Sequence, residues 1–138
     1  MRKIYCILLI VLISSCASKK AQTVSLNKLN GAWVPISQEM SGKALPKPYF
    51  EKQRLIIEDT LYTVIAESID RGIVKVTGNK LDIYGKEGVN AGKHFTGLFE
   101  LDKDRLTVCY NLKGDYYPTN FTTQPKSALF MSVFTRVQ

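Results

Sequence analysis

Residues 93–112 read KHFTGLFELDKDRLTVCYNL, and this stretch decides the fold class. Every second residue over 95–101 is apolar or glycine, which places these residues on one face of an extended strand. The same alternation runs over residues 106–110. Residues 102–104 separate the two runs, and their small number and two aspartates suit a hairpin turn. We therefore predict an antiparallel pair of strands.

The rest of the chain repeats this pattern, with short β-branched and aromatic runs separated by Gly, Asn, Asp or Pro. The predicted strands cover residues 32–38, 53–58, 61–68, 72–77, 80–84, 93–101, 105–112 and 128–137. Since sequence neighbours are joined by short connections, we predict an all-β fold: a small eight-stranded antiparallel up-and-down barrel, whose closure leaves no unpaired edge. Two prolines in residues 46–52 suit a short helical turn after the first strand, and this turn is expected to cap one end of the barrel.

The two ends of the predicted barrel carry Gly31-Ala32-Trp33 in the first strand and Arg136 near the end of the last. This arrangement resembles lipocalin-like (calycin-like) barrels, in which the first strand carries Gly-x-Trp and an arginine of the final strand packs over the indole. First and last strands of a closed barrel are neighbours, so a guanidinium over Trp33 would fasten the seam with ~0.5–2 kcal/mol. The resemblance thus predicts Trp33 and Arg136 as a barrel latch.

Further motifs over residues 29–136 resemble an uncharacterised lipocalin-like domain family first defined in planctomycetes. The matching positions are Leu29, Gly31, Trp33, Gly42-Lys43, Gly92-Lys93, Gly97-Leu98-Phe99-Glu100-Leu101, Leu106-Thr107-Val108-Cys109, Pro118 and Phe121. Tyr117 departs from the family, which usually has arginine there, so no role of that guanidinium carries over. The resemblance implies the barrel fold and leaves the biochemical role open.

The N-terminus has the order of a secretory signal, with Arg2 and Lys3 before an apolar run over residues 4–13. This run is well short of the ~20 residues that a membrane-spanning helix needs. It ends in Ile13-Ser14-Ser15-Cys16, which resembles the lipobox of bacterial lipoproteins. The resemblance implies a diacylglyceryl group on the Cys16 thiol, cleavage before Cys16 and acylation of the new amino terminus. The alternative is a plain secreted protein that is cleaved elsewhere.

A lipidated Cys16 implies a protein held at a membrane of the cell envelope, because two or more acyl chains anchor stably where one does not. Ala17, which follows it, favours the outer membrane by the usual sorting rule. We therefore expect a signal peptide over residues 1–15 and a lipidated tether over residues 16–28. Residues 29–138 are the predicted barrel domain.

Composition excludes several function classes. Without residues 1–15 the chain keeps 17 Lys and Arg against 12 Asp and Glu, and these basic residues are scattered, which excludes a typical nucleic-acid binder. His94 is the only histidine, so no His-based zinc site is expected. Cys109 is the one cysteine left after loss of Cys6 and acylation of Cys16, so it has no disulfide partner. We predict no catalytic residue, cofactor or metal.

Two hypotheses for function remain. In the first, the protein is an interaction or structural module with a filled barrel, and its Tyr116-Tyr117-Pro118 loop meets an envelope protein. In the second, the barrel interior holds a small apolar or amphipathic ligand. The lining predicted for that case is Trp33, Phe95, Phe99, Leu106, Val108, Met131 and Val133, with Tyr116 and Tyr117 near a mouth. Short strands and bulky side chains favour a filled barrel. An apolar cavity above ~300 Å³ would favour ligand binding, whereas a core packed without such a void would count against it.

Overall fold

The computed structural model of the protein describes residues 25–138; the predicted signal peptide, Cys16 and most of the predicted tether lie outside this range. The described chain forms nine strands and two short 3-10 turns. In order these are η1 (Leu26–Leu29), β1 (Gly31–Met40), β2 (Lys43–Ala44), η2 (Lys47–Tyr49), β3 (Arg54–Glu58), β4 (Leu61–Ile65), β5 (Ile69–Thr77), β6 (Lys80–Glu87), β7 (His94–Asp102), β8 (Arg105–Asn111) and β9 (Leu129–Arg136). Within residues 25–138, no helix has the length and apolar character needed to cross a membrane.

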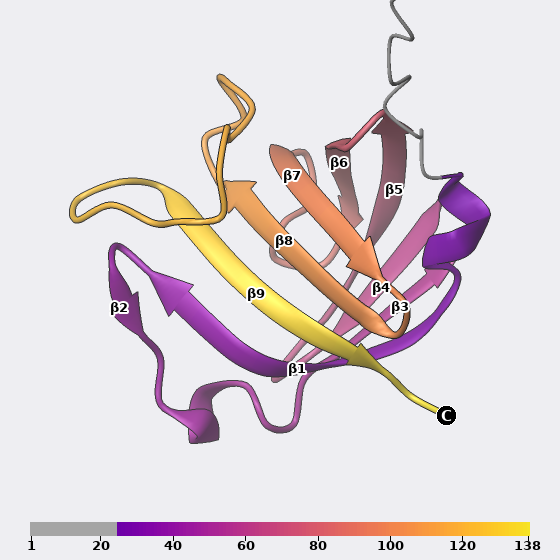
Figure 1. The fold of residues 1–138 in the computed structure, drawn as a ribbon. Helices are drawn as coiled ribbons and strands as arrows, with labels where there is room; N and C mark the ends of the chain where they lie inside the picture. Colours follow the sequence, from indigo (N-terminus) through magenta and orange to yellow (C-terminus); the bar gives the residue numbers. More distant parts are fainter. Residues whose placement is uncertain (1–24) are drawn as a thin grey trace, which may run out of the picture.

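Eight of these strands close into an antiparallel barrel in the order of the chain, which confirms the predicted fold class (Figure 1). β1 pairs with β3, each later strand pairs with the next, and β9 returns to pair with β1. In this seam Trp33 stands opposite Arg136, and Met40 stands opposite Phe130. Closure gives every long strand a partner on both sides.

The hairpin predicted from residues 93–112 forms as β7 and β8. Phe99 stands opposite Val108, and Leu101 stands opposite Leu106. At the turn between them Lys103 has a φ of 53°, the left-handed conformation that closes a tight connection. The apolar face of this hairpin joins the core of the barrel, as the alternation predicts.

β1 departs from regular pairing at Ile36, where its register against β9 shifts between Pro35 and Ser37. Proline has no N–H to donate to a neighbouring strand, and a bulge is one of the few places in a sheet that tolerate it. Beyond the bulge β1 no longer pairs with β3, and its end pairs with the two-residue β2. The sequence did not predict this small outer hairpin.

One end of the barrel is closed by η1, whose Leu29 is buried in the core. Leu26 packs against the same core, so residues 26–28, expected in the tether, belong to the folded domain. The helical turn expected in residues 46–52 forms as η2, but Tyr49 is exposed and no η2 residue lines the barrel interior. Of the two 3-10 turns, only η1 therefore closes an end of the barrel.

The long connection between β8 and β9, residues 112–128, loops out from the ends of these two strands (Figure 1), and parts of it contact the outer face of β8. The Asn111 side chain on β8 donates a hydrogen bond to the Tyr116 carbonyl at 3.0 Å. Cys109, also on the outer face of β8, is fully buried beneath the connection, with its Sγ 3.9 Å from the Thr122 carbonyl oxygen. The barrel thus has a second layer on this side.

Candidate ligand cavity and its closed end

Trp33 lies at the closed end of the barrel and is completely buried. Its Nε1 donates a hydrogen bond to the Leu29 carbonyl at 2.9 Å, so the indole holds η1 against the barrel. The Arg136 guanidinium lies over the indole, with Cζ 4.2 Å from the ring centroid, in a cation–π contact. The structure therefore brings the two predicted latch residues together.

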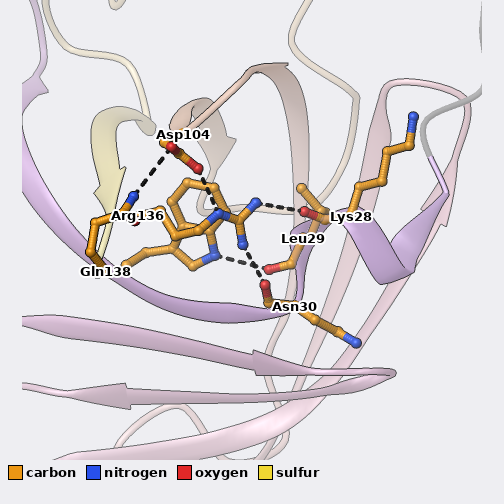
Figure 2. Close-up of polar contacts among 7 residues, drawn as sticks. Lys28, Leu29, Asn30, Asp104, Arg136 and Gln138 are labelled. Atoms are coloured by element: carbon orange, nitrogen blue, oxygen red, sulfur yellow. Dashed lines mark hydrogen bonds and ion pairs between the residues drawn. The ribbon is translucent and has the colours of Figure 1, made fainter.

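Arg136 also binds the backbone around η1 (Figure 2). Its terminal nitrogens donate to the carbonyls of Lys28 at 2.9 Å and Asn30 at 2.5 Å. Its Nε donates to Asp104 Oδ1, in the turn between β7 and β8, at 3.1 Å. A single side chain thus joins β9, the η1 segment and a hairpin turn.

Gly31 makes room for this contact. It has a φ of 130°, a conformation that residues with a side chain rarely adopt, and a Cβ built there would lie 3.0 Å from Nη1 of Arg136. The glycine of Gly-x-Trp thereby has a physical cause, because the guanidinium above Trp33 needs bare backbone at Gly31.

A cavity of about 190 Å³ occupies the barrel interior; its lining includes Leu29 of η1 at one end and, toward the opposite strand ends, Gln38, Asp70 and Asn90, where we place its mouth. Its walls are mostly apolar. They include Leu29, Leu55, Ile57, Val64, Val74, Leu81, Ile83, Phe95, Leu106, Val108, Phe130 and Phe134. The barrel is therefore neither completely filled nor hollow on the ~300–1,000 Å³ scale of sites for drug-sized ligands.

Polar side chains gather where the cavity opens. Gln38 on β1 is buried and donates a hydrogen bond to Gln53 Oε1 at 2.8 Å. Asp70 on β5 is only 7% exposed, and its Oδ1 accepts a hydrogen bond from the backbone N–H of Asn90 at 3.0 Å. All four residues line the cavity, so its mouth is polar while its depth is apolar.

Two tyrosine hydroxyls add polarity inside the cavity. Tyr62 on β4 and Tyr110 on β8 both line it. Burial raises the pKa of Tyr62, and the Asp70 carboxylate raises it further. Burial also raises the pKa of Tyr110, with a smaller contribution from Tyr62. Both phenols therefore stay protonated at neutral pH and can donate a hydrogen bond.

Only some of the predicted lining residues face the cavity. Phe95, Leu106 and Val108 line the cavity as expected. Trp33 and Phe99 lie in the hydrophobic core beside it without lining it.

Met131 and Val133 were predicted inside the barrel, and this prediction is wrong. The residues of β9 that face the cavity are Phe130 and Phe134, so Met131 and Val133 point to the outer face. Because side chains alternate along a strand, an offset of one residue exchanges the two faces.

Tyr116 and Tyr117 do not line the mouth either; they lie on the outer wall. The Tyr117 hydroxyl donates to Asp82 Oδ2 at 2.7 Å, and His94 Nε2 lies 2.8 Å from Asp82 Oδ1. Burial alone would raise the pKa of Asp82, but the hydrogen bonds from Tyr117 and His94 outweigh burial and lower it. This cluster fastens the connection between β8 and β9 to the outer face of β6.

The polar cavity residues were not predicted from the sequence. The predicted strand begins at Gly72, whereas β5 begins at Ile69, so Asp70 falls outside the predicted alternation. Val74, Gly72 and Asp70 are spaced two residues apart, so extending the predicted strand back to Asp70 would have placed its side chain on the inner face. Gln38 follows the bulge in β1, which changes the face on which later residues lie.

Reactive groups are sparse in the described chain. Within residues 25–138, no three or more His, Cys, Asp and Glu side chains are grouped to hold a metal ion. Burial raises the pKa of the Cys109 thiol, and the Glu39 carboxylate adds to this effect. The thiol is therefore held in its protonated, unreactive form.

Comparison with known proteins bears on the fold. No model of a protein family matches the chain, and no curated protein matches it. Among solved structures, the chain is similar to the crystal structure of an uncharacterized protein from Bacteroides eggerthii DSM 20697. The match has a TM-score of 0.52 and 11% sequence identity, and it covers 78% of this chain and 98% of that chain. At this identity the similarity shows a shared fold alone.

Proposed function

We propose that this protein is an envelope lipoprotein, anchored by lipid on Cys16, whose lipocalin-like barrel binds a small apolar or amphipathic ligand. The cavity carries the proposal, because it is apolar toward the closed end and polar at its mouth. A molecule with an apolar body and a polar head matches both parts.

The volume of the cavity limits the size of the ligand. About 190 Å³ is less than the ~300 Å³ at which sites for drug-sized ligands begin. It is more than the ~150 Å³ of an apolar cavity that stays dry and binds benzene. The part of the ligand inside the barrel is therefore a single ring or a short alkyl chain, and a longer molecule would extend through the mouth.

The proposed anchor and the mouth belong to opposite ends of the barrel. The described chain begins at Ser25 and passes directly into η1, which lies at one end of the barrel (Figure 1). Residues 16–24 can span at most ~30 Å when fully extended, so lipid on Cys16 would keep the closed end near the membrane.

An interaction module is the second candidate, and the exposure of Tyr116 favours it. This side chain is 52% exposed, although hydrogen bonds from Thr96 and Asn111 fix the carbonyl of the same residue. A large aromatic group on a fixed backbone loses little conformational entropy on meeting a protein partner. Tyr116→Ala would weaken capture of such a partner and leave the cavity unchanged.

Native mass spectrometry of the protein purified from its own host tests the proposal directly. A retained small molecule in one-to-one ratio is the expected result, and bare monomer counts against a tightly bound ligand.

A thermal-shift experiment with hexanol tests whether the cavity is the site. Hexanol should raise the melting temperature of the full chain in a saturable manner, because a ligand that binds only the folded state stabilises it. Val74→Phe fills the cavity and should abolish the response. Ile73→Phe, on the opposite face of the same strand, should retain it. Equal responses in the two variants would contradict a site inside the barrel.

A further inference from the structure

The mouth of the cavity contains one buried negative charge. Asp70 lines the cavity at 7% exposure, and its Oδ1 accepts the hydrogen bond from Asn90. Its Oδ2 accepts no hydrogen bond from residues 25–138. Asp70 is a lining residue of the cavity, so its carboxylate lies beside the space in which the head of a ligand would lie.

Tyr62 and Tyr110 line the same cavity. Gly72, which stands opposite Tyr62, is two residues from Asp70, so the Tyr62 and Asp70 side chains share one face of the β4–β5 pair. A head group that donates hydrogen bonds can use the carboxylate and the oxygen of either phenol. An anionic head can accept from the phenols, but the carboxylate repels it.

A positive charge at the rim does not cancel this effect. Arg54 also lines the cavity, but it is an exposed residue at the start of β3. Water and salt screen the field of an exposed charge much more than that of a buried one. Arg54 therefore offsets the charge of Asp70 only in part, although the whole chain has a formal net charge of +7.

From these contacts we infer that the barrel selects amphipathic ligands with a cationic or neutral hydrogen-bond-donating head, such as a primary amine, and rejects carboxylates. Asp70 is the discriminating residue. This inference rests on the proposed function and names the ligand class of the same site. The amine would donate to Asp70 Oδ2, while the apolar body lies against Leu106 and Val108 in the deeper part of the cavity.

Three ligands that share one alkyl chain test the inference: hexylamine, hexanol and hexanoate. Titration calorimetry on the full chain with Cys16→Ala avoids detergent, and at pH 7 the amine and the carboxylate are both charged. Hexylamine should bind at least about tenfold more tightly than hexanoate, because one unpaired charge lies close to the head in a partly buried site. Hexanol should fall between them.

Two variants separate the role of Asp70 from general electrostatics. Asp70→Asn keeps an oxygen for the Asn90 N–H and should remove most of the preference for the amine. Asp102→Asn, at the exposed last residue of β7, should leave that preference unchanged. The net positive charge of the chain attracts hexanoate at long range. Tighter binding of the amine would therefore come from groups close to its head, such as Asp70.

The outcomes distinguish this inference from the proposed function. Equal binding of the three ligands, or tighter binding of hexanoate, would overturn the inference and leave ligand binding intact. A preference that survives Asp70→Asn would overturn the role of Asp70. If none of the three ligands binds the parent chain, both the inference and the proposed function fail.

Discussion

The guanidinium of Arg136 lies 4.2 Å from the ring centroid of Trp33, and the two residues stand opposite each other where β9 meets β1. This pair closes the seam of the barrel and, through the Leu29 carbonyl, attaches η1 over one end. The Trp33–Arg136 contact and η1 therefore lie at the same end of the barrel. Access to the interior is left to the opposite mouth, where Asp70 lies.

Trp33→Ala should lower the free energy of unfolding by ~3–5 kcal/mol, because it leaves a large void in the core and removes the platform under Arg136. Urea denaturation measures this loss. Trp33→Phe keeps a ring beneath the guanidinium but loses the hydrogen bond to the Leu29 carbonyl, so it should cost less. A loss below ~1 kcal/mol for Trp33→Ala would contradict a buried indole, since such small effects are typical of surface sites.

Gly31→Ala should destabilise the protein more than Gly78→Ala does. Gly78 has a φ of 63° and a Cβ there would meet no atom within 4 Å, so alanine costs only ~1–2 kcal/mol of backbone strain. Gly31 has the strained φ and the close approach to Arg136 as well. The difference between the two urea midpoints measures the combined cost of the Gly31 backbone conformation and its contact with Arg136. Equal losses would mean that neither adds to the strain of an ordinary left-handed position.

The regular part of the barrel could be predicted because its hairpins are local. Alternation and a three-residue connection specify β7 and β8 from residues 93–112 alone. The bulge at Ile36 could not be predicted in this way, because it depends on how β1 meets β9, a strand nearly a hundred residues away. The two residues of β2 are too few for any alternation to be recognised.

The mouth of the cavity is harder to predict because it is assembled from the ends of strands. Gln38, Asp70 and Asn90 come from three separate parts of the chain, and each lies near a strand boundary or a bulge. Near such points an offset of one residue exchanges inward and outward faces. The same offset placed Met131, rather than Phe130, inside the predicted barrel.

Cys16→Ala should abolish incorporation of labelled palmitate, because this thiol is the predicted acceptor of the lipid. Cys109→Ser is the matched control, and it should be acylated like the parent chain because the Cys109 thiol is buried in the folded domain. Cell fractionation should find the acylated protein with membranes, since multiple acyl chains anchor stably. Label that persists in Cys16→Ala would overturn the assignment of the lipid anchor.

Tyr117→Phe should raise the pKa of Asp82 toward its usual range, because it removes one of the hydrogen bonds that lower this pKa. A carboxyl group whose folded-state pKa is lowered stabilises the protein above its unfolded pKa of ~3.9, and this contribution is lost as pH falls through the folded pKa. As the pH is lowered below about 4, the free energy of unfolding of the variant should therefore fall less than that of the parent. Carbon NMR of the Asp82 carboxyl measures the pKa. Tyr116→Phe, whose hydroxyl has no hydrogen bond to the described chain, should leave it unchanged.

Thr123→Val should expose Cys109 to alkylation by loosening the connection that covers it. The Thr123 hydroxyl donates to Glu39 Oε1 and accepts from the Gly42 N–H at 2.7 Å, so valine leaves the Gly42 N–H without this partner and leaves Glu39 Oε1 only the backbone N–H of residue 123. An unsatisfied buried group costs ~1–3 kcal/mol, which predicts about a tenfold or greater rise in the iodoacetamide reaction rate if this connection opens locally. Thr119→Val, at an exposed position of the same connection, should leave the rate unchanged. If the rate is the same in both variants, the connection opens independently of its Thr123 contacts, and the thiol is shielded by the barrel strands instead.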